Sequence, residues 1–168
     1  MRALSRLLGI TSTPLSPPDP TPLQGVSFTL QARRMLSVQL HHTGRVRGGL
    51  LFGESRAGTL HVTVVTPPAL PHWGGPPLEL DERYVLGWSD AMHALYRGQI
   101  DWVGNWVARA DSALPTHEEE LTWFEQGAAS GLFDEQCVLV TAGWADGVLT
   151  GRASVVFGGS WGALPVHL

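Results

Sequence analysis

Apolar residues recur at helical spacing in two stretches of the first half of the chain, with short apolar runs between them. Leu36 and Leu40 belong to the first helical pattern, and Val85 and Met92 belong to the second. The pattern predicts helices over 29–42 and 81–97 and, between them, strands over 48–53 and 59–66.

The second half of the chain predicts a longer series of strands around one helix. Thr116 followed three residues later by Glu119 fits a capping box, so a helix should begin there and run to about 129. Asp146-Gly147 has the composition of a two-residue hairpin turn. The expected strands of this half are 100–107, 137–141, 148–157 and 161–167.

Strict alternation predicts which side chains share a face of the sheet. In the strand 59–66, Val62 and Val64 should point the same way. In the strand 100–107, Trp102 and Trp106 should share one face and Val103 should lie on the other.

This order of elements predicts one α/β (α+β) domain over 26–168, in which a mixed central sheet is flanked by about three helices. Residues 1–25 are rich in proline and are expected to form a flexible extension. A chain of 168 residues has the length of a single domain, and it can bury a hydrophobic core without disulfide bonds or structural metal ions.

Composition removes several classes of function. The net charge of −4 argues against nucleic acid as a partner. All eleven basic residues are arginine, so there is no lysine for a phosphate loop or a Schiff base. The single cysteine, Cys137, excludes an internal disulfide, and no apolar run reaches the ~20 residues that span a membrane. A cytoplasmic protein without a membrane partner is expected.

The order of the elements, together with three local motifs, resembles the JAMM/MPN (JAB-type) domain, a family of zinc-dependent isopeptidases and their inactive relatives. The segment 46–53, Val-Arg-Gly-Gly-Leu-Leu-Phe-Gly, is similar to the family's Glu-x-Gly-Gly-Val-Leu-x-Gly strand. The segment 104–110, Gly-Asn-Trp-Val-Ala-Arg-Ala, is similar to its metal strand, Gly-x-Trp-His-x-His-Pro. The third motif is the start of the helix after the metal strand. The resemblance implies an MPN-like fold with the layering of cytidine deaminases.

The same register implies that the family's catalytic groups are missing. The general-base glutamate falls on Val46, and the two histidine ligands fall on Val107 and Arg109. The family's aspartate ligand falls on Glu120, eleven residues beyond Arg109, and its serine falls on His117. A shift of one residue would place Thr116 and Glu119 at the serine and aspartate positions instead.

Catalytic zinc takes about three protein ligands and an open water position. Valine offers no lone pair, and an arginine brings a permanent positive charge to the place of a dication. We therefore expect no zinc and no other cofactor. Our hypothesis is that Arg109 takes the place of the metal and pairs with Glu120 or Glu119. The alternative is that Arg109 is an exposed arginine on a loop. For the acidic run 118–120, the alternative to a ligand role is stabilisation of the N-terminus of its helix.

The residues around that position are treated together as a candidate vestigial site. Its members are Arg109, Asp111, Thr116, His117, Glu119 and Glu120. A site of relocated zinc ligands among Asp111, His117 and Glu120 is the alternative reading, and it would make the chain a metal-dependent peptidase or isopeptidase. A third interpretation is a pocket at Arg109 that binds an anionic small molecule.

The leading expectation is a catalytically inactive domain that works as a protein-interaction or scaffold module. The resemblance implies two kinds of partner, an MPN-type subunit or a ubiquitin-like protein, and a second copy of the chain is a further candidate. Trp73 and Trp161 lie in segments rich in glycine and proline, where burial is difficult. These two tryptophans are the expected partner surface, although packing that closes the loops is the competing interpretation.

Overall fold

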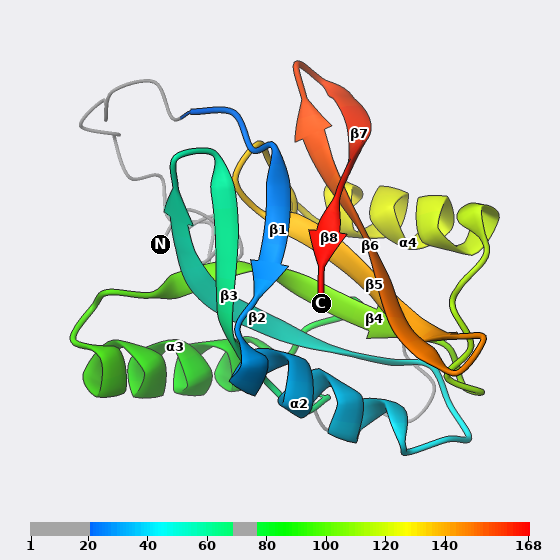
Figure 1. Ribbon diagram of the computed structural model, residues 1–168. Coiled ribbons are helices and arrows are strands. Elements are labelled where there is room, and N and C mark those ends of the chain that lie inside the picture. Colours follow the sequence, from blue (N-terminus) through cyan, green and yellow to red (C-terminus); the bar gives the residue numbers. More distant parts are fainter. Residues whose placement is uncertain (1–20, 69–76) are drawn as a thin grey trace.

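Eight strands form one strongly curled sheet in the computed structural model of the chain, which describes residues 21–68 and 77–168 (Figure 1). The order across the sheet is β7-β6-β5-β4-β2-β3-β1-β8. The strands are β1 (Gly25–Phe28), β2 (Arg47–Arg56), β3 (Thr59–Val65), β4 (Asp101–Ala108), β5 (Val138–Ala145), β6 (Val148–Phe157), β7 (Ser160–Leu164) and β8 (Val166–His167).

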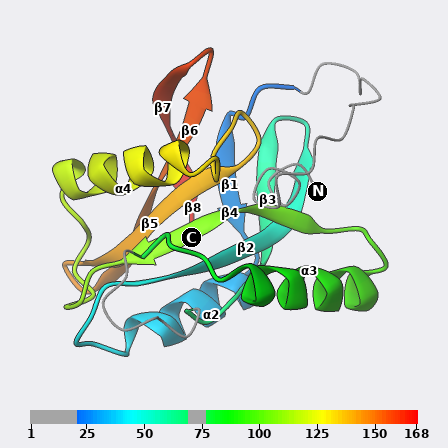
Figure 2. The same ribbon diagram turned by 180° about the vertical axis from the view of Figure 1, so that it is seen from behind.

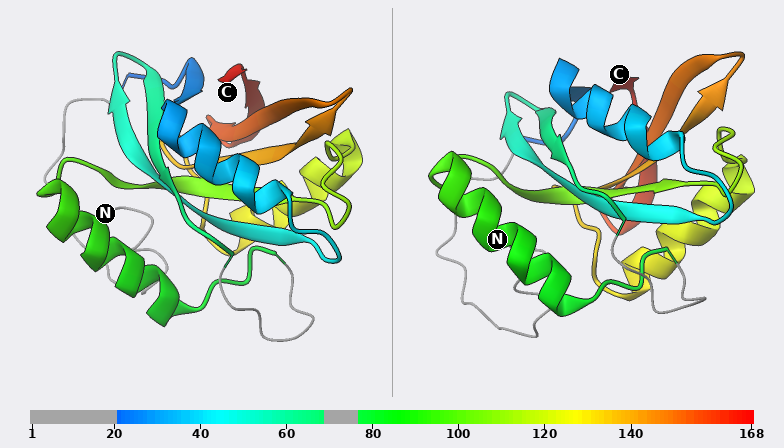
Figure 3. Two further views of the ribbon diagram at one scale, coloured as in Figure 1. Left: turned by 60° about the horizontal axis from the view of Figure 1, so that its bottom comes forward. Right: turned by 90° about the horizontal axis from the view of Figure 1, so that it is seen from below.

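The helices cover the two faces of this sheet unequally. They are α2 (Leu30–Leu40), α3 (Glu82–Tyr96) and α4 (His117–Ala129). Seen from behind and from below, α2 lies on one face, and α3 and α4 lie on the other (Figures 2 and 3). Each face has its own apolar core: Leu36 of α2 belongs to one, and Met92 of α3 and Trp123 of α4 belong to the other.

The broad fold class predicted from the sequence is confirmed. The sheet is mixed, since β4–β5 and β1–β3 are parallel while β2–β3, β2–β4 and β5–β6 are antiparallel. Three helices flank it among the described residues. None of the helices in the described part of the chain is long and apolar enough to cross a membrane.

The folded region begins earlier than the predicted residue 26. Leu23 is buried, and β1, which the sequence pattern did not predict, starts at Gly25 and runs parallel to both β3 and β8. The expected last strand, 161–167, is divided by Pro165 into β7, which pairs with β6, and β8, which pairs with β1.

Two predictions about strand faces are wrong, because β-bulges interrupt the alternation. The β2–β3 register skips Thr63, so Val62 and Val64 pack in different cores. The β2–β4 register skips Val103, and Trp102 and Trp106 consequently lie on opposite faces. An extra residue on one strand reverses the face of the sheet to which each later side chain points, and it increases the local twist.

Glycine permits the backbones to approach closely at this curled region. A Cβ on Gly53 would lie 2.0 Å from the carbonyl oxygen of His61, and one on Gly104 would lie 2.3 Å from that of Val138. The bulges and these glycines together explain how β2 and β4 bend through the middle of the sheet.

Two local predictions from the sequence are confirmed. Thr116 caps α4, with Glu119 completing the capping box. Asp146 and Gly147 both have positive φ, 50° and 75°, as a type I′ turn between β5 and β6 requires. Cys137, which the sequence pattern places in the strand 137–141, is buried and lies just before β5.

Candidate functional site

The positions singled out by the family resemblance lie at one end of the adjacent strands β2 and β4. Arg47 pairs in register with Ala108, so Val46, just before β2, and Arg109, just after β4, lie at the same end of the two strands. The Gly44 amide donates to the Ala110 carbonyl at 2.9 Å and ties the two loops together. The chain then enters α4, whose first turn carries the acidic run.

Val107, which the resemblance assigns to the first histidine ligand, lies on the face of the sheet that α4 covers. Val107 of β4, Thr141 of β5 and Arg152 of β6 are neighbours in register across three strands. Val107 is completely buried in the core that α3 and α4 cover. Its side chain is therefore part of the hydrophobic core and cannot bind a metal.

Glu120 is a buried carboxylate whose two oxygens are already occupied. Arg152 Nε donates to Glu120 Oε2 at 2.8 Å, and Ser154 Oγ donates to Glu120 Oε1 at 3.0 Å. Arg152 also donates to the carbonyl of Pro115, just before the helix. The guanidinium therefore joins α4 to β6 and neutralises the carboxylate that the resemblance places at the aspartate ligand.

Arg109 pairs with the neighbouring glutamate and not with Glu120. Its Nη1 lies 3.3 Å from Glu119 Oε2, while Nε and Nη2 each lie 3.2 Å from an oxygen of Asp111. Glu119 Oε2 also accepts from the Thr116 amide at 2.8 Å in the capping box. Of the two pairings expected from the sequence, the one with Glu119 is observed, and Arg152 takes the other glutamate.

Asp111 fixes the turn that follows β4. Its Oδ1 accepts from the Ala113 amide at 3.0 Å. This backbone hydrogen bond, helped by the guanidinium of Arg109, lowers the pKa of the Asp111 carboxyl below its ordinary value.

Three of the residues singled out from the sequence remain: His117 of the candidate site and the two tryptophans of the expected partner surface. His117 is exposed on the first turn of α4, its ring centroid 5.3 Å from that of Trp161 on β7. Trp161 is 40% exposed, so the structure leaves it at the surface beside the first turn of α4. Trp73 lies outside the described residues.

The residues present do not fit a catalytic zinc ion. Val107 has no lone pair, Arg109 carries a positive charge, and both oxygens of Glu120 accept hydrogen bonds. His117 Nδ1 lies 4.0 Å from Glu120 Oε2, but Asp111 is held by Arg109. Over 21–68 and 77–168, no three His, Cys, Asp or Glu side chains form a group that could hold a metal ion.

Two residues of β6 that complete this site were not predicted from the sequence. Arg152 and Ser154 stand two positions apart, which puts them on one face of a strand and marks a polar patch. Their partner, Glu120, lies more than thirty positions earlier in the chain. Only the pairing of β5 with β6 and the packing of α4 bring the three together.

Two buried polar side chains nearby were missed as well. Arg47 of β2 donates to Ser112 Oγ at 2.6 Å, and Ser112 Oγ donates to the Leu40 carbonyl at the end of α2. Burial lowers the pKa of the Arg47 guanidinium. Asn105 of β4 is fully buried, and its amide has no hydrogen-bond partner among the described residues.

The comparisons with known proteins bear on the fold alone. No protein-family model matches the chain, and no curated protein is similar to it in sequence. The solution structure of protein DSY2949 from Desulfitobacterium hafniense is similar in fold, with a TM-score of 0.58. The two are 14% identical, and the match covers 84% of this chain and 90% of that chain.

Proposed function

We propose that the chain is a JAMM/MPN-like domain without zinc chemistry, and that it acts as a protein-interaction module. The observation that carries the proposal is the ion pair between Arg152 and Glu120. An acidic residue in the place of a zinc ligand needs a positive charge beside it when it is buried. Here an arginine of the chain supplies that charge.

The placement of two of the family-like motifs supports the first half of the proposal. The segments 46–53 and 104–110 come from antiparallel neighbours, β2 and β4. The general-base position, Val46, and the histidine positions, Val107 and Arg109, therefore lie at one end of these two strands. The aspartate position, Glu120, follows in the first turn of α4. Sequence similarity alone did not require this convergence, since the motifs are about fifty residues apart.

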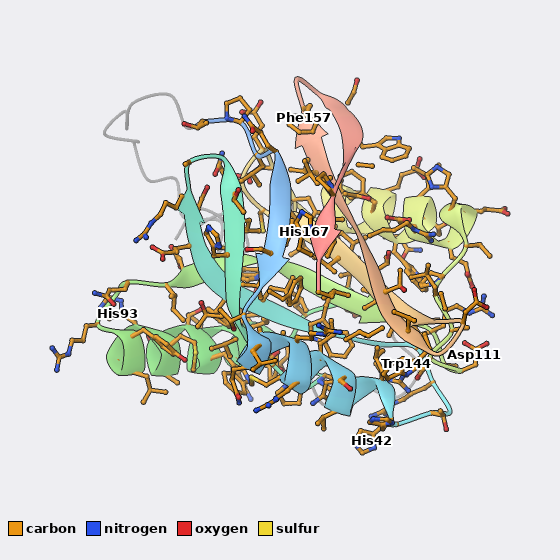
Figure 4. All side chains as sticks on the ribbon, in the orientation of Figure 1. His42, His93, Asp111, Trp144, Phe157 and His167 are labelled. Atoms are coloured by element: carbon orange, nitrogen blue, oxygen red, sulfur yellow. The ribbon has the colours of Figure 1, made fainter. Side chains whose placement is uncertain are left out.

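The surface beside the vestigial site supports the second half. β7 is the terminal strand of the sheet, and among residues 21–68 and 77–168 no strand pairs with its edge facing away from β6. It carries Trp161, and the last residue of β6 is the exposed Phe157, which Figure 4 shows at the outer end of the β6–β7 hairpin. An edge strand with exposed aromatic residues suits an extended segment of a partner, added as a further strand. A ubiquitin-like tail and a segment of an MPN-type subunit both have that form, as does a second copy of the chain.

Metal content tests the first half of the proposal. The purified, untagged chain is equilibrated with excess zinc, passed through a desalting column and analysed by mass spectrometry. We expect a zinc stoichiometry near zero. A stoichiometry near one that falls in the His117→Ala and Glu120→Gln variants would instead establish relocated ligands, and peptide cleavage would then have to be assayed.

Edge-strand binding tests the second half. The three partner classes are presented separately: a ubiquitin-like protein with a free tail, an MPN-domain protein, and the chain itself at high concentration. Trp161→Ala should abolish whichever interaction is found, whereas Leu95→Ala, which removes an exposed leucine from α3, should leave it intact. Equal binding by both variants, or no binding by any class, would contradict the proposed surface.

A further inference from the structure

A groove lies between α2 and the β5–β6 hairpin, on the face of the sheet opposite α3 and α4. Its volume is about 620 Å³, in the range of cavities that bind ligands or the side chains of a peptide. The residues that matter for its chemistry are Leu30, Arg33, Arg34, Val38, Trp144 and Val148. Figure 4 shows Trp144 where the hairpin meets the end of α2. We call this feature the α2 groove.

The apolar side chains of the α2 groove are exposed to an unusual degree. Leu30, Val38 and Val148 are 64%, 54% and 60% exposed, and Trp144 is half-buried beside them. Eight large apolar side chains are exposed in the described part of the chain, and three of them line this one groove. Exposed apolar residues scattered singly need no explanation, but a cluster in a concave surface marks a place where another molecule binds.

The charge of the α2 groove is opposite to that of the whole protein. The chain has a net charge of −4, yet residues 21–53 contain four arginines and no aspartate or glutamate. Arg33 and Arg34 line the groove, and neither forms an ion pair within 21–68 and 77–168. Asp146 of the hairpin turn is exposed but does not line the groove.

The first turn of α2 also lacks the acidic residues that favour a helix N-terminus; Arg33 lies within it and Arg34 comes next. Local helix stability therefore does not explain why these charges are here. Residues that do not favour the helix they belong to are expected where binding to another molecule has selected them.

We infer that the α2 groove is a docking site for a short amphipathic segment of another protein, with aliphatic side chains on one side and acidic side chains on the other. The aliphatic side chains would cover Leu30, Val38 and Val148, and the carboxylates would pair with Arg33 and Arg34. A second copy docked by its own α2 would oppose arginine with arginine, which disfavours that arrangement. The inference does not depend on the vestigial site or on the edge of β7.

Selection from a random peptide library displayed on phage, against the immobilised full chain, tests the inference. We expect the enriched peptides to combine aliphatic with acidic residues. The selected peptides, made synthetically, should bind at least about tenfold more weakly to Arg33→Glu/Arg34→Glu and to Val38→Asp. All three positions are exposed, so the variants should fold. Trp161→Ala should bind normally, which separates this site from the one proposed above.

A charge exchange provides the decisive control. Peptides with lysine in place of each acidic residue should bind Arg33→Glu/Arg34→Glu and not the unmodified chain. Selected peptides without acidic residues, or peptides whose binding ignores both groove variants, would overturn the inference, as would a library that gives no enrichment. Tight binding of a labelled single-stranded oligonucleotide that depends on Arg33 and Arg34 but not on Val38 would replace it with a nucleic-acid site.

Discussion

Arg152 of β6 donates to Glu120 of α4 at 2.8 Å, and the carboxylate it neutralises is almost completely buried. Glu120 has no other cation at hydrogen-bonding distance among the described residues, since His117 is 4.0 Å away. The position of α4 on the sheet therefore depends on this pair as well as on apolar packing.

Replacing Arg152 with methionine should destabilise the protein strongly, because it leaves a buried charge without a partner. Breaking a fully buried pair costs roughly 3–5 kcal/mol, and since the Arg152 side chain is 38% exposed we expect about 2–3 kcal/mol. Chemical denaturation measures the loss. Adding Glu120→Gln should recover part of it, and strictly additive effects of the two substitutions would show that the pair is not coupled.

Histidines at the two positions that the family resemblance assigns to zinc ligands should create zinc binding once Glu120 is released from Arg152. The variant Val107→His/Arg109→His/Arg152→Leu supplies two imidazoles and one carboxylate, the minimum of about three protein ligands. We expect close to one zinc ion per chain by mass spectrometry, against none for the unmodified protein. Arg109→His/Arg152→Leu is the matched control and should stay free of zinc. A folded triple variant without zinc would contradict the assigned register.

Alanine should have opposite effects at two helical glycines. At Gly127 of α4 a Cβ would lie 2.1 Å from the ring of Phe133, which is buried and stacked on Phe124. Gly127→Ala should therefore cost about 1–3 kcal/mol through overpacking. At Gly87 of α3 nothing lies within 4 Å, so Gly87→Ala should stabilise the protein by up to about 1 kcal/mol. The melting temperatures of both variants test the packing of α4. A Gly127→Ala variant as stable as the unmodified protein would contradict it.

Asp111→Asn should weaken the turn after β4 at neutral pH and have less effect in acid. The pKa of Asp111 is lowered in the folded protein, so its carboxylate stabilises the fold above the ordinary pKa of an unfolded aspartate. That contribution is lost as the pH falls through the folded pKa. Urea unfolding of both proteins at neutral pH and near pH ~3 measures the difference. A gap that stays constant between the two conditions would argue against the role given to the carboxylate.

Local chemistry explains what the sequence predicted well. The capping box at Thr116 and Glu119 and the Asp146-Gly147 turn depend on residues within a few positions of each other. Propensities and hydrogen bonds at that range are readable without tertiary contacts. The helices were accordingly placed to within a few residues.

The missed features depend on partners far along the chain. β1 has four residues, too few for a periodic pattern, and its neighbours β3 and β8 come from distant segments. The bulges at Thr63 and Val103 arise from the shape of the curled sheet. The same holds for the candidate site: Arg109, Glu119 and Glu120 could be singled out from the sequence, but strand pairing decides that Arg152 neutralises Glu120.

The pairing of β1 with β8 also bears on how the protein reaches this structure during synthesis. Val26 lies beside Val166 in the finished sheet, so β1 has only β3 as a neighbour until some 140 further residues have left the ribosome. Contacts so distant along the chain slow folding, and they expose an unpaired strand to other nascent chains in the meantime. The N-terminal half of this protein is where we expect a chaperone to bind first.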